Sequence, residues 1–168
     1  MASMSPLETA LADVERHADA AGWDRPPQLF ALVETTQLLD SQPHLAAQLG
    51  GSAATYTPVE QEAIPDGPLD EALAQIAWPE GVAGCALVHE VLVLPPSAEA
   101  ERPVTADPEQ YAREHADRRE VRLAVAVLTD GSSASAVRLR ATAGRAEELL
   151  FGTDLAPNLA EALLATLR

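Results

Sequence analysis

The segment from Glu120 to Arg140, EVRLAVAVLTDGSSASAVRLR, constrains the fold more than any other part of the chain. Along both of its halves, apolar residues alternate with polar or small ones, which is the pattern of a β-strand with one apolar face. Thr129-Asp130-Gly131 lies between the two halves, and glycine suits the left-handed position that closes a three-residue hairpin loop. The segment therefore predicts an antiparallel β-hairpin.

The length of the loop decides the register of this hairpin. A three-residue loop pairs Leu123 with Val137 on an apolar face, and Arg122 with Arg138 on a face otherwise made of alanine. A two-residue turn at Asp130-Gly131 would instead place Arg138 opposite Leu123. That register mixes the two faces, which a half-buried sheet resists. We therefore expect the three-residue loop.

Helical and extended patterns alternate along the rest of the chain. Ser5-Pro6-Leu7-Glu8 combines an N-cap serine, proline at the first helical position and a capping-box glutamate, so we expect a helix from here to Gly22. Cys85–Leu94, CALVHEVLVL, is apolar on both alternating faces, as in a central strand covered on both sides. The other expected elements are strands at Gln28–Glu34 and Thr55–Ile64 (an edge strand, because of Pro58), helical pieces at Thr35–Asp40, Pro43–Leu49, Pro68–Ala77 and Pro108–Ala116, and a closing helix from Pro157.

These elements predict an α+β fold with a single antiparallel sheet of about five strands and helices packed chiefly on one face. A chain of 168 residues with 47% hydrophobic residues is long enough to bury one core. We therefore assign residues 1–168 to a single domain. Aromatic residues make up only 4% of the chain, so this core must consist mainly of Leu, Val and Ala.

The charge of the chain excludes several classes of function. A formal net charge of -15 opposes nucleic-acid binding, which needs a basic surface. No apolar run is long enough for membrane insertion, and the N-terminus lacks the basic and apolar regions of a signal peptide. Cys85 is the only cysteine, so neither an internal disulfide nor a zinc site with two thiolates can form. We expect a cytoplasmic protein without metal or cofactor.

Arginines on both arms of the hairpin are unexpected in so acidic a chain. Arg122 opposite Arg138 is an unfavourable like-charge pair unless an anion lies nearby, and Glu120 opposite Arg140 offsets part of this. One interpretation is internal: the guanidinium groups pair with the protein's own carboxylates, with Glu90 as a candidate. The other is a binding site for an anion or an acidic partner at Arg122, Arg138 and Arg140. The small alanines beside them indicate that another element packs over this face.

Other reactive residues give no catalytic pattern. Cys85 and His89 lie four residues apart on one expected strand, which separates their Cα atoms by about 13 Å and prevents a nucleophile pair. We interpret them as a buried thiol and a core histidine with satisfied hydrogen bonds. Trp23 and Trp78 lie in proline-flanked turns and are expected to fill the ends of the core. The acidic residues of the first helix are expected on its solvated face.

Four segments together resemble an uncharacterised family of acidic proteins from actinobacteria: GWDRPPQLFALVETTQLL, IAWPEGVAGCALVHEVLVLPP, DRREVRLAVAVLTDGSSASAVRLR and DLAPNLAEALLATLR. The resemblance covers almost the whole chain and implies a cytoplasmic protein, but it brings no catalytic or binding residue with it. The order of elements is also similar to the type III secretion chaperone-like fold, a small α+β domain that often dimerises. Fold alone does not define function.

We therefore expect a non-enzymatic cytoplasmic binding or adaptor protein that acts on a protein partner or as a homodimer. The first alternative is a sensor or enzyme that binds a small anionic metabolite at the three arginines, and a third possibility is a structural subunit with no site of its own. We favour a binding function over catalysis, because no motif with a defined chemistry accompanies the arginines.

Overall fold

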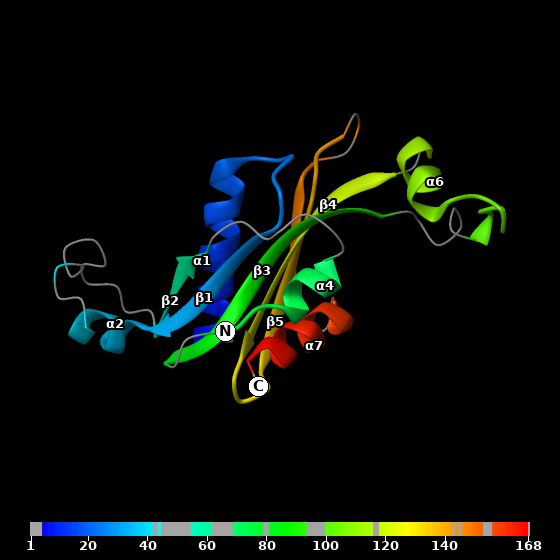
Figure 1. The fold of residues 1–168 in the computed structure, drawn as a ribbon. Coiled ribbons are helices and arrows are strands. Elements are labelled where there is room, and N and C mark those ends of the chain that lie inside the picture. The colour runs from blue at the N-terminus through cyan, green and yellow to red at the C-terminus, as the bar shows by residue number, and fades with distance from the viewer. Residues whose placement is uncertain are drawn as a thin grey trace.

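The expected hairpin lies within one open antiparallel sheet. The structure is a computed structural model, and it describes residues 5–41, 44, 55–61, 69–78, 81–93, 100–115, 118–142, 144, 146–152 and 156–167. Within these residues the sheet has six strands in the order β2-β1-β3-β4-β5-β6 (Figure 1). The strands are β1 (Gln28–Glu34), β2 (Tyr56–Glu60), β3 (Val82–Val93), β4 (Arg119–Leu128), β5 (Ser133–Leu139) and β6 (Glu148–Gly152). The helices are α1 (Pro6–Ala21), α2 (Thr35–Ser41), α4 (Leu69–Ala74), α6 (Pro108–Glu114) and α7 (Pro157–Thr166).

The hairpin of β4 and β5 has the predicted register. Leu123 lies opposite Val137, and Arg122 lies opposite Arg138. The Leu128 N–H donates to the Ser132 carbonyl oxygen, so this pair closes a loop of three residues, 129–131. The last of them, Gly131, has a φ of 96°, which glycine adopts without strain. The three-residue loop is therefore confirmed, and it keeps the apolar side chains and the alanines on separate faces.

Helix α1 begins and ends where the sequence predicts. The Ser5 side chain accepts the backbone N–H of Glu8 at 3.1 Å, and the Glu8 carboxylate accepts the backbone N–H of Ser5, which completes the capping box. Gly22, with a φ of 90°, ends the helix. The buried stripe of α1 consists of Leu7, Ala10, Leu11, Val14, Glu15 and Ala18.

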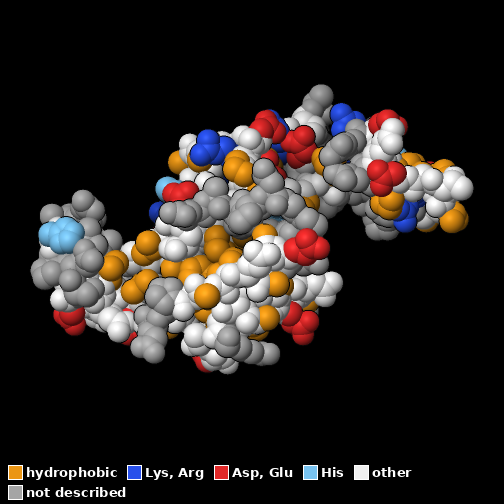
Figure 2. Space-filling model, in the orientation of Figure 1, with side chains coloured by type: hydrophobic (Ala, Val, Ile, Leu, Met, Phe, Trp, Pro, Cys, Tyr) orange, Lys and Arg blue, Asp and Glu red, His pale blue; other side chains and the backbone are white. Residues whose placement is uncertain are grey.

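Helices cover both faces of the sheet, whereas we expected them chiefly on one. Helix α1 lies against one face and α4 and α7 lie against the other (Figure 1). Figure 2 shows hydrophobic side chains gathered on the face that carries α4 and α7. The core on the α1 side includes Leu11, Val14, Phe30, Leu32, Val88 and the alanines 86, 124, 126, 134 and 136. The core on the other side includes Leu29, Leu73, Cys85, Leu87, Val125, Val127 and Leu163.

The alanines explain how α1 approaches the sheet. Ala124 and Ala126 of β4 and Ala134 and Ala136 of β5 are at most 3% exposed, and they form a flat strip under the helix. Small side chains let a helix backbone lie close to a sheet, while longer side chains extend past it. The expectation that an element packs over the alanine face is confirmed, and that element is α1.

Strand order confirms two further predictions and adds one strand. β3 is a central strand with both faces buried around Cys85–Leu87, and β2, with Pro58, is an edge strand. β6 was not predicted; it raises the strand number from about five to six.

The helical pieces at Pro68–Ala77 and Pro108–Ala116 are present as α4 and α6. Apart from residue 44, the piece expected at Pro43–Leu49 lies outside the described residues. In the described ranges, none of the helices has both the length and the apolar character needed to cross a bilayer.

Gly84 provides a test of how closely β3 and β4 approach. It lies opposite Leu128 on β4, next to the irregularity in the pairing of β1 with β3. A Cβ atom at Gly84 would clash with the backbone carbonyl oxygen of Val127. We therefore expect Gly84→Ala to displace the strands and to lower the free energy of unfolding by about 1–3 kcal/mol in urea denaturation. An unchanged denaturation midpoint would show that the strands can separate here without cost.

Candidate functional site

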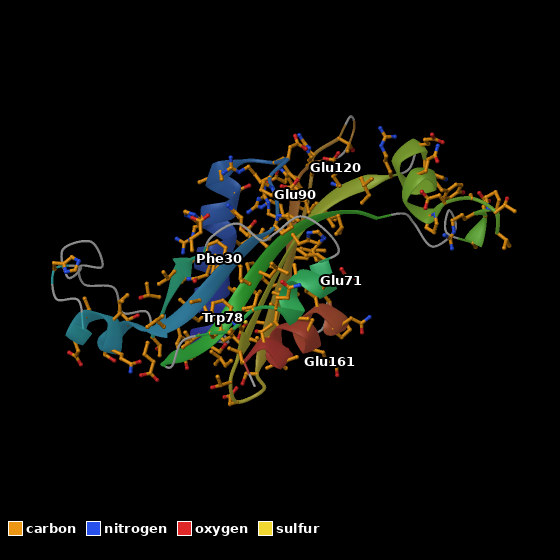
Figure 3. The ribbon with its side chains drawn as sticks, in the orientation of Figure 1. Phe30, Glu71, Trp78, Glu90, Glu120 and Glu161 are labelled. Carbon is orange, nitrogen blue, oxygen red and sulfur yellow. The ribbon has the colours of Figure 1, made fainter. Side chains whose placement is uncertain are left out.

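The three arginines predicted as site residues lie together at one end of the sheet, on the α1 side. Arg122 belongs to β4 and its side chain is 1% exposed; Arg138 belongs to β5 and is 15% exposed; Arg140 follows β5 and is 34% exposed. Figure 3 marks this end by Glu90 and Glu120, and in Figure 2 basic and acidic side chains lie intermixed there. The hairpin register therefore brings the three arginines together, as predicted.

Arg122 is held by the C-terminal end of α1. Its guanidinium donates to the Gly22 carbonyl oxygen at 2.9 Å and to Asp19 Oδ1 at 3.3 Å, and it lies 3.8 Å from Glu15 Oε1. Its Cζ atom also lies 4.3 Å from the centroid of the Trp23 ring, within the range of a cation–π contact. These partners together offset the free-energy cost of burying the Arg122 charge.

Glu15 connects the two opposed arginines. Its carboxylate accepts two hydrogen bonds from Arg138, one from Nε and one from Nη2 at 2.8 Å, in addition to its ion pair with Arg122. The Glu15 residue is only 2% exposed. The hydrogen bonds to Glu15 raise the pKa of Arg138 most, and the bond to Glu147 raises it further, so this side chain stays protonated. The anion that the Arg122–Arg138 pair requires is therefore supplied by α1.

Arg140 is the most exposed of the three arginines. It donates to Asp24 Oδ1 at 3.0 Å and also to Glu120, and these two hydrogen bonds raise its pKa. Its Cζ atom lies 5.3 Å from the Trp23 ring centroid. Trp23 thus packs on two guanidinium groups, and its expected place at the end of the core stays a prediction.

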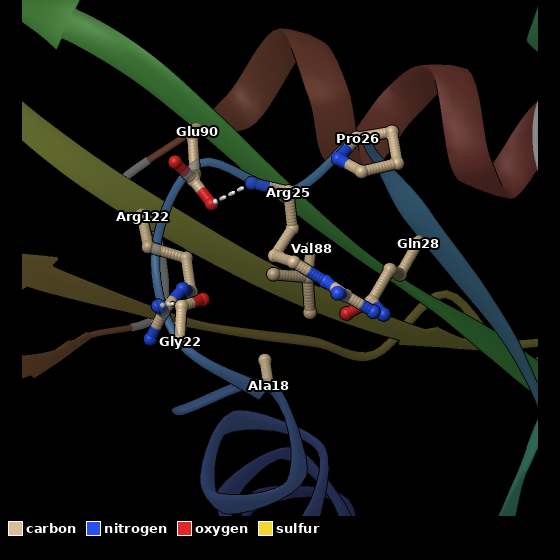
Figure 4. Close-up of a pocket in the computed structure, with 8 residues that line it drawn as sticks. All are labelled: Ala18, Gly22, Arg25, Pro26, Gln28, Val88, Glu90 and Arg122. Carbon is tan, nitrogen blue, oxygen red and sulfur yellow. Dashed lines mark hydrogen bonds between the residues drawn. The ribbon is translucent and has the colours of Figure 1, made fainter. Parts of the chain in front are cut away.

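Two expectations about acidic residues near these arginines are wrong. Glu90 lies opposite Arg122 in the sheet, but its carboxylate accepts the backbone N–H groups of Asp24 and Arg25 at 2.9 and 3.0 Å (Figure 4). Asp24 has a φ of 66°, so Glu90 holds a turn in a conformation that is unfavourable for a non-glycine residue. Glu15 was expected on the solvated face of α1 and is buried instead. Its position four residues after Leu11, beside the apolar stripe, is the signal in the sequence that could have identified it.

The cluster is saturated by the protein's own groups. Three guanidinium groups meet five carboxylates, those of Glu15, Asp19, Asp24, Glu120 and Glu147, so the cluster carries excess negative charge. In the part of the chain that is described, the hollow lined by Arg122, Arg25 and Glu90 leaves no room for a water molecule (Figure 4). This arrangement stabilises the junction of α1 with the sheet, and an added anion would have to displace a carboxylate.

Other candidate groups lie apart from this cluster. Burial raises the pKa of the Cys85 thiol to about 11, which makes it a poor nucleophile at neutral pH. Burial lowers the pKa of His89, whose Nδ1 has no hydrogen-bond partner among the described residues, so the expectation of a fully satisfied histidine is wrong. Trp78 donates to Thr166 on α7 at 2.8 Å and fills the end of the core, as expected. The described residues contain no group of side chains arranged to hold a metal ion.

A second candidate site lies at the edge of the sheet formed by β6. Two of its apolar residues are strongly exposed, Leu150 at 52% and Phe151 at 50%. Leu149 and Phe151 lie on the α1 side of the sheet, because they are opposite Arg138 and Ala136, and Leu150 lies on the other side, opposite Val137. A short edge strand with large exposed apolar side chains is a common feature of strand-pairing surfaces.

The hydrogen bonds of the hairpin show which backbone groups of β6 face outward. The N–H groups of Leu128 and Arg140 donate to the carbonyl oxygens of Ser132 and Glu120, so even-numbered residues of β5 point toward β4 and odd-numbered ones toward β6. Residues 148, 150 and 152 of β6 oppose those odd-numbered residues and point inward. The N–H and C=O groups of Leu149 and Phe151 therefore point outward, where no described strand pairs with them.

The fold and the two candidate sites define an α+β protein with one open antiparallel sheet, a saturated ionic cluster on one face and, at one edge, a strand whose outer side pairs with no described strand. The chain belongs to the PPA1309-like protein family, whose model matches residues 7–168. This membership agrees with the resemblance to an actinobacterial family, whereas the similarity to the type III secretion chaperone-like fold stays a prediction. No curated protein and no solved structure matches the chain.

Replacement of Glu15 tests whether the ionic cluster is structural. Glu15→Gln removes the buried carboxylate and leaves Arg122 and Arg138 facing each other. We expect the free energy of unfolding in urea to decrease by about 3 kcal/mol, because a buried charge loses its partner. Asp13→Asn on the same helix is the matched control, since its pair with Arg16 is exposed and its loss should change stability by less than about 0.5 kcal/mol. Equal effects of the two substitutions would contradict a structural role for Glu15.

Proposed function

We propose that this protein is a non-enzymatic binding or adaptor protein that pairs with a protein strand along the outer edge of β6. The observation that carries the proposal is that the backbone N–H and C=O groups of Leu149 and Phe151 point outward from the sheet. On the same strand, the apolar side chains of Leu150 and Phe151 are exposed. Backbone hydrogen bonds then supply affinity, and alternate side chains supply specificity. The proposal places the protein in the cytoplasm, as expected from its sequence.

The opposite edge of the sheet supports the choice of β6. The N–H groups of Thr35 and Gln61 donate to the carbonyl oxygens of Thr55 and Leu29. By the same alternation, the odd-numbered residues of β2 face β1 and Pro58 faces outward. Proline has no N–H group, so β2 lacks a donor at the centre of its free edge. Natural sheets protect edges in this way, and β6 has no equivalent residue.

The arginine cluster gives less support to the alternative function, a sensor or enzyme for a small anionic metabolite at Arg122, Arg138 and Arg140. Each guanidinium group already donates to carboxylates of the protein. A ligand would have to compete with Glu15 or Asp24 for these donors. An increase in Tm on addition of phosphate or citrate, absent in Arg140→Gln, would favour the alternative over the β6 edge.

Substitution at Phe151 tests the proposed function. Phe151→Pro removes an outward-facing donor without removing a hydrogen bond to β5, whereas Phe151→Ala removes the ring and keeps the donor. We expect affinity purification of tagged protein from its own host to recover a protein partner with the wild-type chain, less of it with Phe151→Ala, and none with Phe151→Pro.

The purification has two controls. Far-UV circular dichroism spectra of both variants should match the wild-type spectrum, so that loss of binding is not loss of folding. A substitution at the opposite edge, Val59→Ser, changes another exposed apolar residue and should leave recovery unchanged. Equal recovery with Phe151→Pro and with the wild type would place the binding surface elsewhere.

A further inference from the structure

We propose that the strand that pairs with β6 is the β6 strand of a second copy of this chain, in antiparallel orientation and with Leu150 on the two-fold axis. This inference rests on the proposed function, because it uses the same edge and names the partner. It is carried by three properties of β6: the direction of its backbone groups, the position of its charges and the match of its side chains.

The backbone groups allow one symmetric register centred on this strand. Leu149 and Phe151 point outward, so they must form the hydrogen-bonded pairs of any added strand. Leu149 can exchange both of its bonds with Phe151 of a second copy, and Phe151 with Leu149 of that copy. Four backbone hydrogen bonds result, and Leu150 faces its own symmetry mate as a non-hydrogen-bonded pair. A two-fold axis requires such self-complementarity.

The charges of β6 are compatible with this register. Glu147 and Glu148 lie at its start, and residues 149–152 carry no charge. Antiparallel pairing places Glu148 opposite Gly152 of the second copy and so keeps the acidic ends apart. In a parallel pair the acidic ends would lie side by side, and like charges on adjacent strands are destabilising. The arrangement of charges therefore favours antiparallel over parallel pairing of two copies.

The side chains of the two copies also match. Leu149 packs against the core beneath α1 and would lie opposite Phe151 of the second copy on that face. Leu150 would contact its symmetry mate on the opposite face, where it is now 52% exposed. Pairs of aromatic and aliphatic residues directly across strands stabilise a sheet. The pairing thus covers both exposed apolar residues of β6 at once.

Disulfide trapping tests this register directly. The Cα atoms of a non-hydrogen-bonded pair lie about 4.5 Å apart, within the range that a disulfide spans. Oxidation of purified Leu150→Cys with diamide should therefore give a covalent dimer on a non-reducing gel. The native Cys85 is 0% exposed and does not compete for the oxidant.

Glu148→Cys is the matched control for trapping. It is exposed and lies on the same face as residue 150, but its symmetry mate would be about 13 Å away along the strands. We expect Leu150→Cys to cross-link at least about tenfold faster than Glu148→Cys, because a formed contact raises the effective thiol concentration. Equal rates, or faster linking at residue 148, would overturn the register.

Sedimentation of the purified protein tests the second copy as the partner. We expect the wild-type chain to show a concentration-dependent dimer that grows stronger from low salt to about 0.5 M NaCl, because salt screens repulsion between two acidic chains. Phe151→Pro should be monomeric, and Phe151→Ala should dimerise more weakly than the wild type. A wild-type chain that stays monomeric, or a Phe151→Pro chain that dimerises as the wild type does, would overturn the inference.

The outcomes separate this inference from the proposed function. A monomeric wild-type chain that still recovers a host protein, with recovery lost in Phe151→Pro, would reject the second copy and keep the strand-pairing function. A dimer trapped through Leu150→Cys with no other protein recovered would support the second copy and reject an adaptor function.

Discussion

The rest of the structure depends on the buried carboxylate of Glu15. The hairpin register places Arg122 opposite Arg138, an arrangement that is unfavourable without an anion near both of them. Helix α1 supplies that anion in Glu15, with Asp19 and the carbonyl oxygen of Gly22 as further acceptors. A buried ion pair contributes little net stability, but removal of one partner is costly. We therefore infer that this cluster fixes the position of α1 on the alanine strip.

The ionic cluster also determines where binding is expected. Guanidinium groups are good receptors for carboxylates and phosphates, but here their donors are used inside the molecule. The outward N–H and C=O groups of β6 are different, because the described part of the chain offers them no strand. In the described part of the chain, the arginines on one face are thus paired with the protein's own acceptors, whereas the outward backbone groups at the β6 edge have no strand partner.

The sequence was sufficient for the local features and insufficient for several long-range ones. The alternation of Glu120–Arg140 predicted the hairpin to the residue, because a shift by one position would have exposed its apolar face. Helix α1 was equally clear from its capping box. β6 was missed because Leu149, Leu150 and Phe151 are consecutive apolar residues that do not alternate with polar ones. The partners of the arginines were missed because Glu15 lies 123 residues before Arg138, and its position beside the apolar stripe of α1 does not show which distant residue it contacts. Helices on both faces were missed for a similar reason, since an apolar stripe does not indicate which side of a sheet it will cover.

The difference between the two sheet edges has a consequence for the size of any assembly. Pairing of β6 with its own copy would join two sheets into one twelve-stranded sheet and use the open edge of both molecules. The edges left at the two ends would be the β2 strands, where Pro58 removes the central outward donor. Growth would then stop at two molecules, because no further strand finds a complete set of partners. A protein with two open edges would form longer assemblies, whereas the proline on β2 would limit β6 pairing to a dimer.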